Sequence, residues 1–222
     1  MNEYEKFIES KKRNLLASGF DVEVSELNKN LFDFQQYVVK TAIKKGKYAI
    51  FADCGLGKTF MQLEWARCVV EHTGRPVLIL APLAVVGQTI EQGEIFGIEA
   101  WNYSEFSEVT HTYESATPDT IFVCNYDQLD NIDTSIFSGI VLDESYKIKN
   151  FEGKKRSAII EAFKDTSYKL ACTATPSPND PMELGNHAEF LNTMSRNEML
   201  AMYFVHDGGD TSKWRLKGHA AQ

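Results

Sequence analysis

Five short apolar runs that alternate with helix-period segments set the strongest limit on how this chain can fold. The runs span residues 48–52, 77–81, 121–124, 140–142 and 168–172. None of them alternates cleanly between apolar and polar residues, which is typical of strands covered on both faces. Strands of this kind, separated by helices, predict an α/β fold in which an open parallel sheet lies between two layers of helices. Such sheets bind ligands at the carboxyl ends of their strands.

The helix-period segments lie before the first run, after it, and before the fifth. We expect their apolar residues to face the sheet: Phe34, Val38 and Ala42, then Phe60, Leu63, Ala66 and Val70, then Ile159, Ile160 and Phe163. Residues 1–30 are charged and helix-prone, and predict a peripheral N-terminal extension. Residues 206–210, His-Asp-Gly-Gly-Asp, predict an exposed flexible loop.

A glycine-rich loop follows the first apolar run and precedes an amphipathic helix. It reads Ala-Asp-Cys-Gly-Leu-Gly-Lys-Thr over residues 52–59. Its glycines allow several N–H groups to point into one concavity, which suits the phosphates of ATP, and the helix N-terminus adds positive charge. The lysine would reach the β- and γ-phosphates, and the threonine would ligate Mg²⁺. The predicted ligands are Gly55, Leu56, Gly57, Lys58 and Thr59. The alternative is a glycine turn with an ordinary surface lysine.

An acidic pair, Asp143 and Glu144, ends the fourth run. We expect this end to lie near the phosphate loop, on a neighbouring parallel strand. Asp143 would hold Mg²⁺, because a hard cation takes oxygen ligands. Glu144 would orient and deprotonate the attacking water as a general base. Two solvated acids at a strand end are the simpler alternative.

Two further segments carry candidate residues. Gln35 offers a donor and an acceptor that match the adenine edge, although a glutamine here is also compatible with an ordinary helix position. After the fifth run, the hydroxyls of Thr173 and Thr175 could relay the state of the γ-phosphate, and a rigid, proline-stiffened turn is an equal alternative. Asp180 before Pro181 predicts a capped helix start.

Charge limits how this chain could bind nucleic acid. It has 31 acidic and 23 basic residues, a formal net charge of −8, so any such binding needs a local basic patch. One basic run offers such a patch, and an ordinary solvated helix start fits it equally well. The run consists of Lys147, Lys149, Lys154, Lys155 and Arg156.

Composition removes several other classes of protein. Hydrophobic residues make up 43% and charged residues 24%, as in globular proteins. No apolar run approaches the roughly 20 residues of a membrane span, and the N-terminus has no apolar signal region. We therefore expect a cytoplasmic protein of a bacterium or a phage-infected cell, without a membrane partner. The four cysteines and five histidines show no spacing typical of disulfides or metal ligands.

Taken together, these motifs resemble superfamily 2 helicases and translocases of the Swi/Snf-like branch. The segments that carry the resemblance are Gln35, the loop at 52–59, Asp-Glu-Ser-Tyr-Lys-Ile-Lys-Asn at 143–150 and Thr-Ala-Thr-Pro-x-x-Asn at 173–179. The stretches 183–190 and 214–219 are similar to phage-type DEAD/DEAH-box helicases of that branch. The resemblance covers about residues 31–219.

The resemblance implies a RecA-like first motor domain, a P-loop nucleotide hydrolase. In that family Gln35 would read adenine, Asp143 and Glu144 would run hydrolysis with Lys58, and Thr173 and Thr175 would couple ATP to movement. The nucleic-acid backbone, with double-stranded DNA the expected form, would be contacted at Pro82, Asn125, Tyr126 and Lys149. One departure is Ser145-Tyr146, where Ala-His is more usual.

The expected organisation has three parts: an extension at 1–30, an ATP-binding helicase domain at 31–194, and a tail at 195–222 that leads toward a second motor domain absent from the sequence. The expected function is the ATP-binding half of a DNA helicase or translocase, completed by a second RecA-like domain in cis or in trans. Alone, it would bind ATP and Mg²⁺ but turn over very slowly, because the partner domain supplies an arginine finger. A stand-alone nucleotide-binding interaction module is the alternative, and a small-molecule kinase explains the threonine and glutamine motifs less well.

Overall fold

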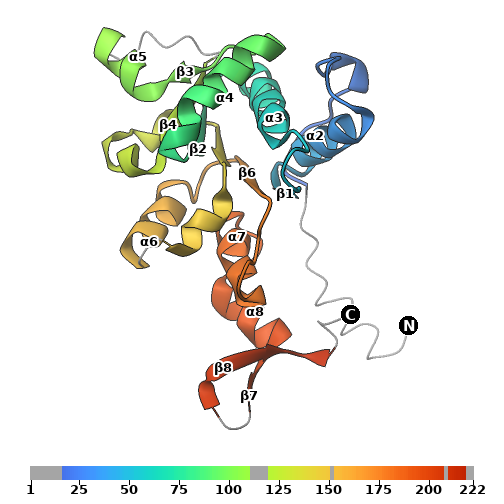
Figure 1. Cartoon of the computed structure of the whole chain (residues 1–222), viewed down its shortest axis with the longest axis vertical. Helices are drawn as coiled ribbons and strands as arrows, with labels where there is room; N and C mark the ends of the chain where they lie inside the picture. Colours follow the sequence, from blue (N-terminus) through green and yellow to red (C-terminus); the bar gives the residue numbers. More distant parts are fainter. Residues whose placement is uncertain (1–16, 111–119, 151–152, 208–209, 219–222) are drawn as a thin grey trace.

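A six-stranded parallel sheet forms the centre of the computed structural model, which describes residues 17–110, 120–150, 153–207 and 210–218 (Figure 1). Its strand order is β1-β6-β5-β2-β4-β3. The strands are β1 (Lys47–Phe51), β2 (Val77–Ala81), β3 (Trp101–Asn102), β4 (Ile121–Asn125), β5 (Gly139–Leu142) and β6 (Tyr168–Thr173). The five predicted strands are confirmed, each to within one residue at either end, and the short edge strand β3 was not predicted.

Helices cover both faces of this sheet, which confirms the predicted three layers. On one face lie α2 (Asp33–Lys45), α3 (Lys58–Thr73) and α4 (Leu83–Phe96), which pack on alternate strand residues such as Ile79 and Val141. On the other face lie α5 (Tyr103–Thr110), α6 (Gly153–Ala162) and α7 (Leu184–Phe190), which pack on the intervening residues, such as Leu78 and Ile140. The sheet is therefore buried on both sides, as its continuous apolar runs predicted.

Helix α2 buries a face rotated from the predicted one. Its buried residues are Gln35, Val39, Ala42 and Ile43, whereas Phe34 is 46% exposed. The reason is that the polar side chain of Gln35 turns inward toward the phosphate loop and takes the place that periodicity assigned to Phe34. Helix α3 follows the prediction, with Phe60, Leu63, Ala66 and Val70 buried, as are Ile159 and Phe163 of the predicted segment before β6.

The N-terminal segment packs onto the sheet domain and does not stand apart from it. In the described residues 17–30 the one helical element is the 3-10 helix η1 (Val24–Glu26), so the helix-prone reading of this part is wrong. Val22, Leu27 and Leu31 are buried in the same core cluster as α2 and α3. Residues 1–16 lie outside the described residues.

A C-terminal arm, defined as α8 (Arg196–Tyr203), β7 (Phe204–Asp207) and β8 (Asp210–Leu216), extends from α7 at the bottom of Figure 1. The two strands form an antiparallel hairpin, so the expected flexible loop is wrong for His206, Asp207 and Asp210; residues 208–209 lie outside the described part. The arm has its own small core around Met199 and Phe204.

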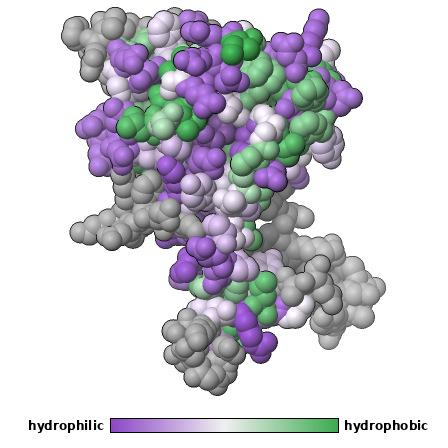
Figure 2. Space-filling model, viewed as in Figure 1, coloured by the Kyte–Doolittle hydropathy of each residue, from purple (hydrophilic) through white to green (hydrophobic). Residues whose placement is uncertain are grey.

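The face of the molecule shown in Figure 2 mixes hydrophilic and hydrophobic residues. The most exposed large apolar residues include Phe32 and Tyr37, at 70% and 73%, in the first turns of α2 and just before it. Among the described residues, none of the helices has the length and apolar character that a bilayer crossing requires.

Candidate functional site

The glycine-rich loop joins the carboxyl end of β1 to the first residue of α3 (Figure 1). Gly55 and Gly57 have φ angles of +80° and +74°, a left-handed backbone that side chains with a Cβ rarely adopt. Gly57 is the N-cap of α3, so the free N–H groups of the first turn, which begins with Lys58 and Thr59, open toward the loop. This geometry suits an anion with several oxygens.

The Lys58 ammonium lies over this loop. Its Nζ donates to the carbonyl oxygens of Ala52 at 3.0 Å and Asp53 at 3.1 Å. These are neutral acceptors, which hold an ammonium less strongly than a charged oxygen does. A phosphate oxygen that entered the loop would therefore find the charge already in position.

Gln35 braces the loop from α2. Its Oε1 accepts from the Phe32 N–H at 3.0 Å, and its Nε2 donates to the Leu56 carbonyl oxygen at 3.0 Å. The residue is 4% exposed, and a Cβ added at Gly57 would collide with its amide group. The role that these contacts assign to Gln35 is support of the phosphate loop, and adenine recognition stays a prediction.

The acidic pair reaches the loop across an intervening strand. The expectation that β5 is the direct neighbour of β1 is wrong, because β6 lies between them. Burial raises the pKa of both Asp143 and Glu144, and the Lys58 charge nevertheless acts across β6 to oppose that rise. Strands β1 and β6 remain paired up to the start of the loop, because the Ala52 N–H donates to the Thr173 carbonyl oxygen at 3.2 Å.

Asp143 is nearly buried, at 6% exposure, and is held by two neighbours that sequence reasoning missed or misassigned. Its Oδ1 accepts from Nε2 of Gln62 at 2.7 Å, and its carbonyl oxygen accepts from the Tyr126 hydroxyl at 2.7 Å. Burial raises the pKa of Asp143, while the Gln62 hydrogen bond opposes that rise. Gln62 is a polar residue one helical turn after Lys58 on a buried helix, which is the signal that could have found it.

Glu144 has a φ of +47°, which is uncommon for a residue with a side chain and is typical of functional turns. Burial raises its pKa, and the Asp143 charge adds to that rise. The Thr173 hydroxyl lies 3.5 Å from Oε2 of Glu144 and accepts from the Thr175 N–H at 3.1 Å. Thr173 therefore joins the acidic pair to the Thr-Ala-Thr loop, while the Thr175 side chain is exposed.

The candidate nucleic-acid residues separate into different environments. Tyr126 is 4% exposed and its hydroxyl is bound to the chain, so a backbone contact by this side chain is wrong. Asn125 caps the 3-10 helix η3 (Tyr126–Asn131), with its Oδ1 accepting from the Asp127 N–H at 2.8 Å. Pro82 is the partly exposed N-cap of α4. Pro82 and Asn125 lie at the ends of the paired strands β2 and β4.

The predicted basic patch is only partly described. The side chains of Lys149, Lys154 and Lys155 lie outside the described residues. Arg156 is not a free surface cation, because its guanidinium forms an ion pair with Glu189 of α7 and its side chain is 21% exposed. This contact joins α6 to α7.

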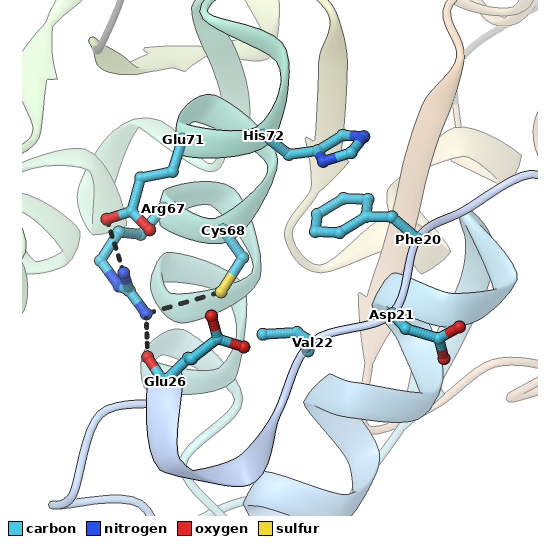
Figure 3. A pocket seen from close by; sticks show the side chains of 8 residues that line it. All are labelled: Phe20, Asp21, Val22, Glu26, Arg67, Cys68, Glu71 and His72. Carbon is cyan, nitrogen blue, oxygen red and sulfur yellow. Dashed lines mark hydrogen bonds and ion pairs between the residues drawn. The ribbon is translucent and has the colours of Figure 1, made fainter.

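A separate pocket of about 220 Å³ lies between the N-terminal segment and the last turns of α3 (Figure 3). Its Arg67 guanidinium is already paired, because it donates to the Glu71 carboxylate at 2.6 Å and to the Glu26 carbonyl oxygen at 2.9 Å. The His72 ring stacks on Phe20 with 3.7 Å between centroids. Burial raises the pKa of the Cys68 thiol to about 12, so this wall offers no reactive thiolate.

Comparison with known proteins is informative over most of the chain. A family model described as "Type III restriction enzyme, res subunit" matches residues 28–178. The SWI/SNF-related matrix-associated actin-dependent regulator of chromatin subfamily A-like protein 1 of Xenopus laevis is 26% identical over 179 residues, 76% of this chain and 18% of that protein. Its Bos taurus counterpart is 25% identical over 166 residues, 72% and 17%. The chain thus spans less than a fifth of these relatives.

Solved structures with a similar fold include an ATPase core and a helicase. The Sulfolobus solfataricus SWI2/SNF2 ATPase core in complex with dsDNA has a TM-score of 0.67 and 23% identity, covering 82% of this chain and 40% of its own. The UvsW helicase of bacteriophage T4 has a TM-score of 0.59 and 16% identity, covering 86% and 66%. These likenesses identify the sheet domain as RecA-like.

Proposed function

The chain belongs to the family described as the res subunit of type III restriction enzymes, with the RecA-like first domain of Swi/Snf-like superfamily 2 proteins, and on that premise we propose that it is the ATP-binding half of a nucleic-acid motor. One observation carries this proposal: Lys58 stands over a curled glycine loop and acts electrostatically on the buried Asp143 and the half-buried Glu144 across β6. A helicase or translocase needs that combination to hold and cleave a triphosphate.

Nucleotide binding uses the loop and the first turn of α3. The N–H groups from Gly55 to Thr59 would bind phosphate oxygens, and Lys58 would exchange two carbonyl contacts for the β- and γ-phosphates. Asp143 and Thr59 fit the oxygen-donor set of Mg²⁺, and the buried Gln62 amide fixes the orientation of the carboxylate. Bound Mg²⁺ would supply neutralisation of phosphate charge.

Hydrolysis would use Glu144 as the general base. Its carboxylate would accept a proton from water as the water oxygen bonds to the γ-phosphorus and the bond to the β–γ bridging oxygen breaks, leaving ADP and phosphate. The raised pKa makes this carboxylate a better proton acceptor than a solvated one. Thr173, which contacts Oε2 of Glu144, would pass the change to the Thr-Ala-Thr loop.

Nucleic acid would bind at the ends of β2 and β4, where Asn125 pairs with Ala81, the residue before Pro82. The named relative from Sulfolobus solfataricus was solved with dsDNA, which supports duplex DNA as the partner. A second RecA-like domain, in cis or in trans, would complete the site with an arginine finger worth roughly 10³–10⁵ in turnover. We propose that the 222-residue chain alone hydrolyses ATP very slowly.

Calorimetry tests the nucleotide site directly. Titration of Mg²⁺ with a non-hydrolysable ATP analogue into the chain should show one binding event, and Lys58→Ala should weaken it by at least about tenfold, because charged hydrogen bonds are lost. Lys29→Ala removes one exposed positive charge elsewhere and should leave the affinity unchanged. Equal affinity in the wild type and Lys58→Ala would overturn the phosphate-loop assignment.

A further inference from the structure

His187 of α7 lies against the residue that follows Glu144. Its Nε2 shares a hydrogen bond of 2.9 Å with the Ser145 hydroxyl, and both residues are buried, at 4% and 0% exposure. The position after Ser145, where the family more usually has histidine, is Tyr146 in this chain. An imidazole thus meets the acidic turn from a different element of the fold.

The same imidazole contacts the strand that leads into the phosphate loop. The ring of Phe51, the last residue of β1, meets His187 edge-on with 5.3 Å between centroids. His187 therefore contacts residues next to both parts of the nucleotide site. Phe51 connects it to the strand before the phosphate loop, and Ser145 connects it to the Asp143–Glu144 turn. Burial lowers the pKa of His187 to about 4, so the ring is neutral at physiological pH.

Helix α7 is firmly joined to the C-terminal arm. Gly185 has no side chain where α8 approaches, and a Cβ there would press on the side chains of Met199 and Arg196. Figure 1 shows α7 between the sheet and the arm. A displacement of α7 would therefore also displace the arm, because α7 and α8 are closely packed at Gly185.

We propose that His187 is a positioning residue for Glu144 and that, through Ser145, it couples the nucleotide site to α7 and the C-terminal arm. The Ser145–His187 hydrogen bond holds the left-handed turn at Glu144 in register with the phosphate loop. When bound nucleotide reorders this turn, the motion of α7 is restrained. The arm, which is packed on α7, then transmits this restraint to a partner. The inference rests on the proposed nucleotide site.

Hydrogen exchange can separate this coupling from nucleotide binding itself. The full chain is compared with and without Mg²⁺ and the non-hydrolysable analogue AMP-PNP, and exchange is followed in residues 52–59 and in α7. In the wild type both segments should exchange more slowly with nucleotide, α7 by about fivefold or more, the lower range of site-to-site coupling.

Two variants remove the hydrogen bond, and a third serves as the matched control. Ser145→Ala and His187→Leu should keep the nucleotide protection of residues 52–59 and lose that of α7. Ser138→Ala removes a buried serine at the opposite end of β5, with its 2.9 Å contact to Thr73, and should respond like the wild type.

The outcomes distinguish this inference from the proposed function. If Ser145→Ala keeps the wild-type response of α7 while residues 52–59 are protected, the coupling is refuted and the nucleotide site stands. If residues 52–59 show no protection in the wild type, the nucleotide site itself is refuted, and the coupling with it.

Discussion

The buried imidazole of His187 predicts a specific loss of stability in mild acid. Burial lowers its pKa to about 4 in the folded chain, from an ordinary value of 6.5. The unfolded chain therefore binds more protons between these two values, and the free energy of unfolding falls as pH drops through that window. Because the side chain is 4% exposed, solvent screening offsets little of this shift.

The magnitude follows from the two pKa values. At pH 7.5 His187 is neutral in both states and contributes almost nothing, whereas at pH 5 the difference amounts to about 2 kcal/mol. Below pH 4 the full loss is reached, about 3 kcal/mol. Urea unfolding of the wild type and His187→Gln at pH 7.5 and pH 5 measures this, since all other titrating groups are common to both proteins.

The difference in pH dependence between the wild type and His187→Gln tests whether the His187 imidazole is buried and neutral. The wild type should lose about 2 kcal/mol more than His187→Gln on going from pH 7.5 to pH 5. His206→Gln removes an exposed histidine in the arm and should follow the wild type. Equal pH dependence in the wild type and His187→Gln would refute the assignment of a neutral, buried imidazole.

Four further substitutions test individual positions of the site. Gln62→Leu removes the amide donor to the buried acid and should weaken Mg²⁺-dependent binding of AMP-PNP by about tenfold in calorimetry, with little change in its absence. Tyr126→Phe should lower the free energy of unfolding by about 1–3 kcal/mol in urea, because a buried carbonyl loses its donor; an unchanged midpoint would contradict this role. Gly57→Ala should abolish nucleotide binding through its collision with the brace from α2, whereas Gly55→Ala meets open space and should cost only the left-handed strain, about 1–2 kcal/mol.

The sheet could be predicted because its signal is local. Each predicted strand is a continuous or nearly continuous apolar run, and the phosphate loop is defined by eight consecutive residues at 52–59. Strand β3 has only two residues, too few to show any periodicity. The hairpin of the arm carried a weak signal, a Gly-Gly pair between segments with β-branched and aromatic residues, which was interpreted as a loop.

The hydrogen bonds that position the acidic turn could not be predicted, because each of them joins residues far apart in the sequence. Gln62 and Tyr126 meet Asp143 from two different elements, and His187 meets Ser145 from a third. Local sequence gives each of them an ordinary alternative: a helix surface, a nucleic-acid contact or a core histidine. The order of β1, β6 and β5 is likewise decided by the packing of the whole sheet. The local sequence could not show that β6 lies between β1 and β5, so β5 was wrongly predicted as the neighbour of β1.

From the charges of the proposed site we expect Mg²⁺ to be required for tight ATP binding. Burial raises the pKa of Asp143 and of Glu144 even though Lys58 and Lys147 both act to lower it. The nearby positive charge therefore does not fully offset the cost of burying these two carboxylates in their charged form. A triphosphate brings more negative charge to the same place. We expect ATP in EDTA to bind at least about tenfold more weakly than ATP with Mg²⁺.

Asp143→Asn provides the control for this expectation, because it removes one negative charge and keeps the shape of the side chain. It should bind ATP in EDTA more tightly than the wild type does, and the gap between the two conditions should narrow. If the wild type bound ATP equally well with and without Mg²⁺, the two acids would not face the phosphates, and their role in hydrolysis would fail with that result.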